Sequence, residues 1–116
     1  METQHAIAAL GALAQETRLA IFRLLVQRGP EGLAAGSIGE ELDVAATTLS
    51  FHLQQLMRAD LIEQRRESRS LIYSAKFTNM NALIGYLTEN CCGGRACAPA
   101  DRSAKDAKLV RRRKSA

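Results

Sequence analysis

Apolar residues recur every three or four positions through the first half of the chain, as they do along one face of an α-helix. The pattern predicts four helices. The second ends at Gly29-Pro30, the third follows the loop EGLAAG, and the fourth follows a DVA turn. The predicted helices cover about residues 3–14, 16–29, 37–42 and 46–59.

Apolar residues recur with helical spacing in each of these predicted helices. In the first helix, Ile7, Leu10 and Leu13 recur every three residues. In the others, the residues predicted to point inward are Leu19, Phe22, Leu25, Val26, Ile38, Leu42, Leu49, Leu53 and Leu56. Because aromatic residues make up 4% of the chain and Trp is absent, this core must consist mainly of Leu, Ile, Val and Ala.

The apolar period changes after Leu61. The segments LIEQRR and SLIYSA predict two short strands joined by the turn ESR, with Leu71 and Tyr73 on one side of the second strand. A last helix is predicted over about residues 79–90. Its apolar stripe consists of Met80, Leu83, Ile84 and Leu87. Helices followed by a hairpin and a final helix indicate a mainly α fold with a β-hairpin wing, which is a winged helix-turn-helix.

The charge of the chain is unevenly distributed. The formal net charge is +4, but residues 101–116 hold seven basic and two acidic side chains, so residues 1–100 are close to neutral. A nucleic-acid interface must therefore come from local placement of charge. No apolar run is long enough to span a bilayer, and no signal peptide is recognisable, so we expect a cytoplasmic protein without a membrane partner.

The fourth predicted helix presents a polar face opposite its leucines. At 100° per residue, Thr47, Ser50, Phe51, Gln54 and Arg58 point outward, with Thr48 and Gln55 on the flank, and no carboxylate occurs before Asp60. Hydroxyl and amide groups bond phosphates and base edges, and a phenyl ring can touch a thymine methyl. A solvent-facing polar helix would show the same pattern, so the face alone leaves both alternatives open.

The segment SFHLQQLMRADL at 50–61 resembles the S-x-H-L-x-x-L-x-x-A-x-L signature of the ArsR/SmtB family of metalloregulatory repressors. ETRLAIFRLL at 16–25 is similar to that family's second helix, and RESR at 66–69 with Tyr73 is similar to its wing. Three departures stand out: Ser68 replaces the usual wing glycine, Ala45-Ala46 replaces a polar helix cap, and the E-L-C-V-C-D-L metal box of the third helix is absent.

The resemblance implies a homodimeric transcriptional repressor paired through the first and last helices. The fourth helix would enter the major groove, and each wing would contact the flanking backbone of an inverted-repeat operator with half-sites about one helical turn apart. His52 would either reach the DNA backbone or brace the helix. The candidate DNA-binding residues are Thr47, Thr48, Ser50, Phe51, His52, Gln54, Gln55, Arg65, Arg66 and Arg69.

All three cysteines of the chain lie in the segment NCCGGRAC, just after the last predicted helix. If that helix continued, Cys91 would extend its apolar stripe and Cys92 would point to the side. Gly93-Gly94 would then let the chain double back and bring Cys97 beside them. Three soft thiolates without a hard ligand suit trivalent arsenic or antimony, which form three bonds. The resembled family includes arsenite sites of this kind outside the third helix.

Other interpretations of the cysteines remain open. They could form a thiol oxidation switch, bind cadmium, lead or zinc, or be inert surface residues. An enzyme is not expected, because a cysteine at a helix C-terminus is not activated by the helix dipole and no nucleotide-binding motif is present. No organic cofactor is expected. We therefore expect a winged-helix DNA-binding and dimerisation domain over residues 1–92, a sensing segment over 91–97, and a mobile basic tail over 98–116.

Overall fold

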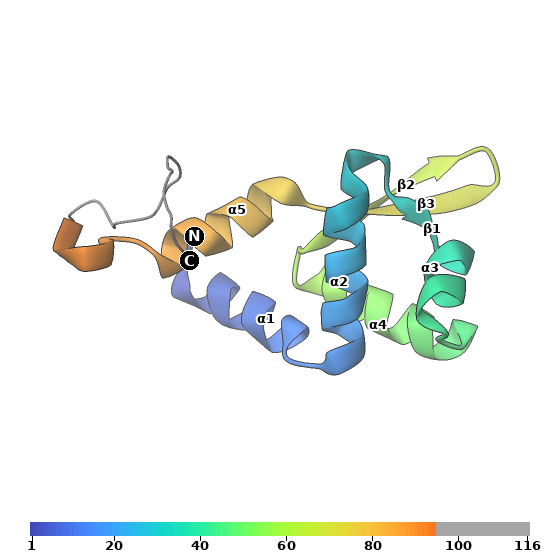
Figure 1. Ribbon diagram of the computed structural model, residues 1–116, viewed down its shortest axis with the longest axis horizontal. Helices are drawn as coiled ribbons and strands as arrows, with labels where there is room; N and C mark the ends of the chain where they lie inside the picture. The colour runs from blue at the N-terminus through green and yellow to red at the C-terminus, as the bar shows by residue number, and fades with distance from the viewer. Residues whose placement is uncertain (95–116) are drawn as a thin grey trace, which may run out of the picture. The chain divides into compact units, whose positions relative to one another are not determined.

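The computed structural model describes residues 1–94, in which the predicted winged helix-turn-helix is confirmed (Figure 1). Residues 1–86 form one compact unit, and a second unit begins at Leu87. The elements are α1 (Thr3–Leu13), α2 (Glu16–Arg28), the 3₁₀ turn η1 (Gly29–Glu31), β1 (Leu33–Ala34), α3 (Ala35–Leu42), α4 (Ala46–Arg58), β2 (Ile62–Glu67), β3 (Ser70–Ala75), α5 (Phe77–Leu87) and the 3₁₀ turn η2 (Cys91–Gly94). No helix within residues 1–94 is long and apolar enough to cross a membrane.

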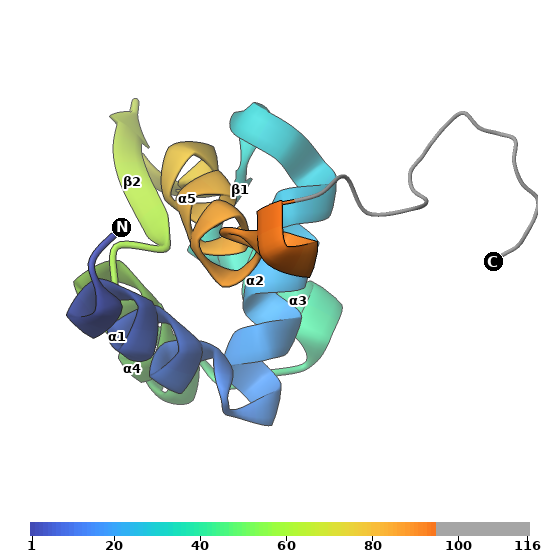
Figure 2. The ribbon, with the colours of Figure 1, turned by 90° about the vertical axis from the view of Figure 1, so that its left-hand side faces the viewer.

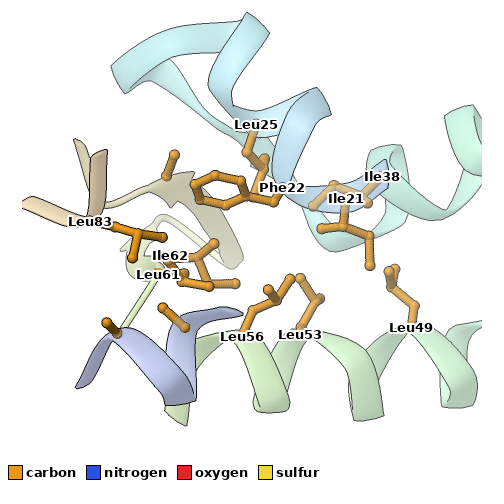
Figure 3. Packing of buried hydrophobic residues seen from close by; sticks show 13 residues of the cluster. Ile21, Phe22, Leu25, Ile38, Leu49, Leu53, Leu56, Leu61, Ile62 and Leu83 are labelled. Carbon is orange, nitrogen blue, oxygen red and sulfur yellow. The ribbon is translucent and has the colours of Figure 1, made fainter. Parts of the chain in front are cut away.

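The core lies where α2 and α4 face one another, with the base of the sheet between them (Figure 3). Its largest fully buried side chains come from α2, α3, α4 and the residue before β2: Ile21, Leu25, Ile38, Leu56 and Leu61. These are aliphatic, as the composition predicts. Burying one such side chain contributes about 1.5–3 kcal/mol, so this small cluster carries much of the stability of the unit.

The buried face of α1 consists of small side chains. Helix α1 packs against α2 and α4 through Ala6 and Ala9, while Ile7 is 64% exposed and Leu10 is also exposed. Small side chains let helices approach closely, and this leaves the larger apolar residues of α1 facing outward. Figure 2 shows α1 lying along α4.

Leu19 was expected to point inward but is 43% exposed. At 100° per residue, it lies about 110° from the mean direction of Ile21, Phe22 and Leu25, which form the buried face of α2. The inward direction of α2 is therefore defined by Ile21, a residue that the stripe did not include.

The sheet has three antiparallel strands in the order β1-β3-β2. The two predicted strands pair from Ile62 opposite Ala75 to Glu67 opposite Ser70. The connecting turn consists of two residues, and the first, Ser68, has a φ of 56°, a conformation that glycine adopts more easily. Strand β1 was expected to be loop; it has only two residues, too few to show a period-2 pattern.

Asp60, which lies just after α4, accepts hydrogen bonds from residues at the start of α5. Asn79 Nδ2 donates to the Asp60 carbonyl oxygen over 2.8 Å and to its carboxylate over 2.6 Å, and Lys76 Nζ donates to the same carboxylate over 2.8 Å. The Lys76 hydrogen bond, aided by that of Asn79, lowers the pKa of Asp60 below its ordinary value. Helix α5 begins at Phe77 and ends at Leu87, earlier at both ends than predicted.

Gly32 allows β1 to approach β3. Its φ is 72°, and a Cβ atom at this position would lie 2.3 Å from the carbonyl oxygen of Tyr73. Real Cβ atoms do not come so close to backbone oxygen, so an alanine here would have to displace the strand that it pairs with.

We therefore predict that Gly32→Ala lowers the free energy of unfolding by about 2 kcal/mol or more, from the left-handed φ and the steric clash together. Urea unfolding followed by circular dichroism would measure the change. The matched control is Gly36→Ala in α3, where a Cβ meets nothing within 4 Å and should leave stability unchanged or slightly raised. An unchanged midpoint for Gly32→Ala would show that β1 is not held at this distance.

Candidate nucleic-acid interface and thiol segment

Helix α4 has one buried face and one exposed face. Leu49, Leu53 and Leu56 are buried and point from α4 into the core, as Figure 3 shows. The opposite face carries exposed hydroxyl, amide, phenyl and guanidinium groups and no carboxylate, and Gln55 is half-buried at its edge. Its exposed residues are Thr47, Thr48, Ser50, Phe51, Gln54 and Arg58. The structure thus places on one surface the side chains that the helical periodicity placed there.

The N-terminus of α4 has no side-chain cap. Ala45 occupies the N-cap position in an extended conformation and has no side-chain oxygen to accept from the first turn. The N–H groups of that turn need an acceptor, and water or an anionic partner can supply it.

His52 lies on α4 but belongs to the interior. It is 8% exposed, and Arg18 Nη1 lies 3.3 Å from its Nδ1. Because a guanidinium has no acceptor, Nδ1 must accept, which puts the proton of the neutral ring on Nε2. Arg18 is itself held by a 2.6 Å hydrogen bond from Nε to the carbonyl oxygen of Ala12. This environment fits a bracing role, one of the two alternatives that the sequence leaves open for His52.

Two physical effects act on the charge of His52. Burial disfavours the protonated ring, and the positive charge of Arg18 disfavours it further, so the pKa of His52 lies below its ordinary value of 6.5. The neutral imidazole is therefore the form that fits the folded structure.

The three wing arginines divide into two kinds. Arg65 points to η1: its guanidinium donates to the carbonyl oxygens of Glu31 (2.7 Å) and Pro30 (3.2 Å) and pairs with Glu67 (2.7 Å). Arg66 lies on the opposite side of β2, because successive side chains alternate along a strand. Arg66 and Arg69 are exposed near the tip of the hairpin. Arg65 thus ties the wing to η1, while Arg66 and Arg69 face solvent.

The thiol segment is residues 91–97, and three residues separate its first cysteine from the end of α5. Cys91 begins η2 and is exposed, as is Cys92, and their Sγ atoms lie 3.6 Å apart, too far for a disulfide bond. Cys92, Gly93 and Gly94 all have positive φ, of 58°, 67° and 91°. The glycines thus have the conformation that the sequence predicts for a fold-back.

The expectation that α5 continues to Cys91 is wrong. The helix ends at Leu87, a turn follows, and Cys91 therefore does not extend the apolar stripe of α5. Cys97 and the basic tail lie outside the described residues. Within residues 1–94, no group of three His, Cys, Asp or Glu side chains is placed to hold a metal ion.

Comparison with known proteins identifies relatives of this arrangement. Residues 13–65 match a helix-turn-helix domain family. The chain is 31% identical over 87 residues to the transcriptional activator HlyU of Vibrio cholerae, covering 75% of this chain and 78% of that protein. It is 40% identical over 65 residues to the uncharacterised HTH-type transcriptional regulator YceK of Bacillus subtilis, covering 56% of this chain and 64% of that protein, just under two thirds of its length.

A solved structure extends the likeness to the fold. The homodimeric winged helix-turn-helix domain Mb0332 of Mycobacterium bovis, described as a possible ArsR-family transcriptional regulator, has a TM-score of 0.59 and 26% identity. The match covers 81% of this chain and 87% of that one.

The lowered pKa of His52 predicts acid sensitivity of the fold. Below about pH 6.5 the unfolded chain protonates this residue while the folded chain resists, so the free energy of unfolding should fall as the pH drops from about 7 to about 5. Urea unfolding at several pH values measures the slope. His52→Asn, which keeps an acceptor for Arg18 but cannot titrate, should flatten this slope, while the same substitution at His5, an exposed residue of α1, should leave most of it. An equal slope in both variants would contradict the assignment.

Proposed function

The chain belongs to the ArsR/SmtB family of winged-helix transcriptional regulators, and from this premise we propose that it is a dimeric repressor released from its operator by trivalent arsenic or antimony. It is a DNA-binding regulator and not an enzyme. The ligand would bind Cys91, Cys92 and Cys97. The observation that carries this ligand assignment is the pair of sulfur atoms 3.6 Å apart in a segment that holds every cysteine of the chain.

The DNA-binding surface is the exposed face of α4 with the tip of the wing. In a winged helix-turn-helix, the second helix of the motif lies in the major groove. Here that helix presents hydroxyl and amide groups without a carboxylate, and its leucines are all used by the core. Arg66 and Arg69 add positive charge where the DNA backbone would pass.

The proposed dimer uses α1 and α5. Ile7 and Leu10 on α1 and Ile84 on α5 are exposed, although each is large and apolar. The two helices are joined by a 2.6 Å hydrogen bond between Thr3 Oγ1 and the Tyr86 hydroxyl. Pairing of this surface between two copies would cover these residues and present two α4 helices to one inverted repeat.

The spacing of the two sulfur atoms supports a shared soft ion. Two thiolates bound to one ion with bonds of about 2.3 Å and bond angles of 90–110° lie about 3.3–3.8 Å apart. The Cys91 and Cys92 sulfur atoms are already within this range. A pair of adjacent thiolates needs a third soft ligand to complete the three bonds of arsenic or antimony, and Cys97 is the third cysteine of the chain.

Ligand binding would release DNA through the conformation of the thiol segment. Binding of one ion by Cys91, Cys92 and Cys97 would close a loop that begins at Cys91. Only three residues separate Cys91 from α5, the helix that would pair the subunits. If one subunit arrangement binds DNA and another binds the ion, each ligand weakens the other. A coupling free energy of about 3 kcal/mol corresponds to a roughly hundredfold loss of operator affinity.

We expect stoichiometric arsenite or antimonite to weaken operator binding about a hundredfold, measured by fluorescence anisotropy of a labelled duplex selected with the full-length protein. Cys97→Ser should bind the operator normally in the absence of the ion and lose most of the response. Ser37→Ala, a substitution in α3 that changes none of the proposed DNA-binding or cysteine residues, is the control.

The same titration series separates the alternatives. Release by cadmium, lead or zinc without release by arsenite would assign the site to a divalent metal. Release by peroxide with loss of titratable thiols would assign it to oxidation. If Cys97→Ser responds to arsenite at the same concentrations as the unmodified chain, the three-cysteine site is wrong.

The two kinds of wing arginine should differ in their salt dependence. Arg66→Gln should lower the slope of log affinity against log salt by about one to two for a dimer, since each subunit loses one phosphate contact. Arg65→Gln should weaken binding with little change in slope, because its guanidinium is bonded to η1 and only positions the wing. A drop in slope for Arg65→Gln equal to that for Arg66→Gln would show that Arg65 leaves η1 to contact phosphate.

A further inference from the structure

We infer that Phe51 reads the 5-methyl group of thymine in the operator, and that Arg18 and His52 hold its ring in position to do so. The inference rests on the proposed placement of α4 in the major groove and adds a base preference to it. It starts from the one large apolar side chain on the exposed face of α4: Phe51 is 55% exposed and lies among the hydroxyl and amide groups of that face.

The ring of Phe51 is in contact with a fixed support. Its centroid lies 5.5 Å from that of His52, with the two ring planes at 64°, an edge-to-face arrangement that aromatic pairs favour. His52 is buried and accepts from Arg18, and Arg18 is bonded to the end of α1. The phenyl ring therefore rests on a chain of contacts that reaches two other helices. A side chain held in this way loses little freedom on binding.

The chemistry of the major groove limits what a phenyl ring can recognise there. Base edges in this groove present hydrogen-bond donors and acceptors, and the apolar group among them is the C5 methyl of thymine. Gln54, one helical turn from Phe51 on the same exposed face, can bond an adenine edge in two places. We therefore expect each half-site to contain a thymine whose methyl group packs against Phe51.

Replacing thymine by deoxyuridine tests this contact directly, because the change removes the methyl group and keeps every hydrogen-bonding group. The operator would first be selected from a randomised duplex library with the full-length protein. Each thymine is then replaced in turn, and affinity is measured by anisotropy. One position in each half-site should lose about fourfold in affinity on substitution, the change expected from one buried methyl group.

Protein variants assign the effect to the side chain. Phe51→Ala should bind more weakly and respond equally to thymine and deoxyuridine at that position. Leu71→Ala, which removes another exposed apolar side chain but on β3, should keep the full response. His52→Asn should reduce the discrimination between thymine and deoxyuridine without changing the salt slope, which identifies His52 as a positioning residue.

The outcomes distinguish this inference from the proposed function. The role of Phe51 is overturned if no replacement of thymine by deoxyuridine weakens operator binding, or if Phe51→Ala keeps the preference for thymine. Either result leaves DNA binding by the protein in place. A protein that selects no operator from the library overturns both. Circular dichroism of each variant confirms that the exposed substitution at position 51 leaves the fold intact.

Discussion

The packing of three leucines on α4 against α2 determines how the proposed DNA-binding surface is presented. Leu49, Leu53 and Leu56 are buried in the same cluster as Ile21 and Leu25, and Figure 3 shows the two sets facing one another. Turning α4 by one residue would expose these leucines and bury Thr48 or Gln54, at a cost of several times the 1.5–3 kcal/mol that each side chain contributes. Because the leucines of the inner face hold α4 in its orientation, the side chains of the outer face are not needed for the core.

The local sequence pattern was enough to predict the fold, but it could not predict contacts between residues far apart in the sequence. The order of helices and strands predicted the winged helix, and the 100° periodicity of α4 assigned its inner and outer faces correctly. The spacing of Ile7, Leu10 and Leu13 predicted a first helix but did not indicate which of its faces packs on α2 and α4; the buried residues there are Ala6 and Ala9. Strand β1 exists because β3 offers it partners, and Gly32 permits the approach.

The candidate site shows the same division. The exposure of Thr47, Ser50 and Gln54 follows from their position on the helix, but nothing near His52 in the sequence announces Arg18, which precedes it by 34 residues. Arg65 similarly finds its acceptors at Pro30 and Glu31, far back in the chain. The nearness of Cys91 to Cys92 follows from adjacency and the two glycines, while the convergence of Cys97 remains a prediction.

Asp60 provides a direct mechanical connection between α4 and α5. Its main-chain carbonyl and its carboxylate are both held by residues at the start of α5, and Asp60 itself follows α4 after a single residue. These hydrogen bonds connect the end of α4 directly to the start of α5. In the proposed dimer, a tilt of α5 would pass through Asp60 to α4 and would change the distance between the two α4 helices while each leucine core stays closed.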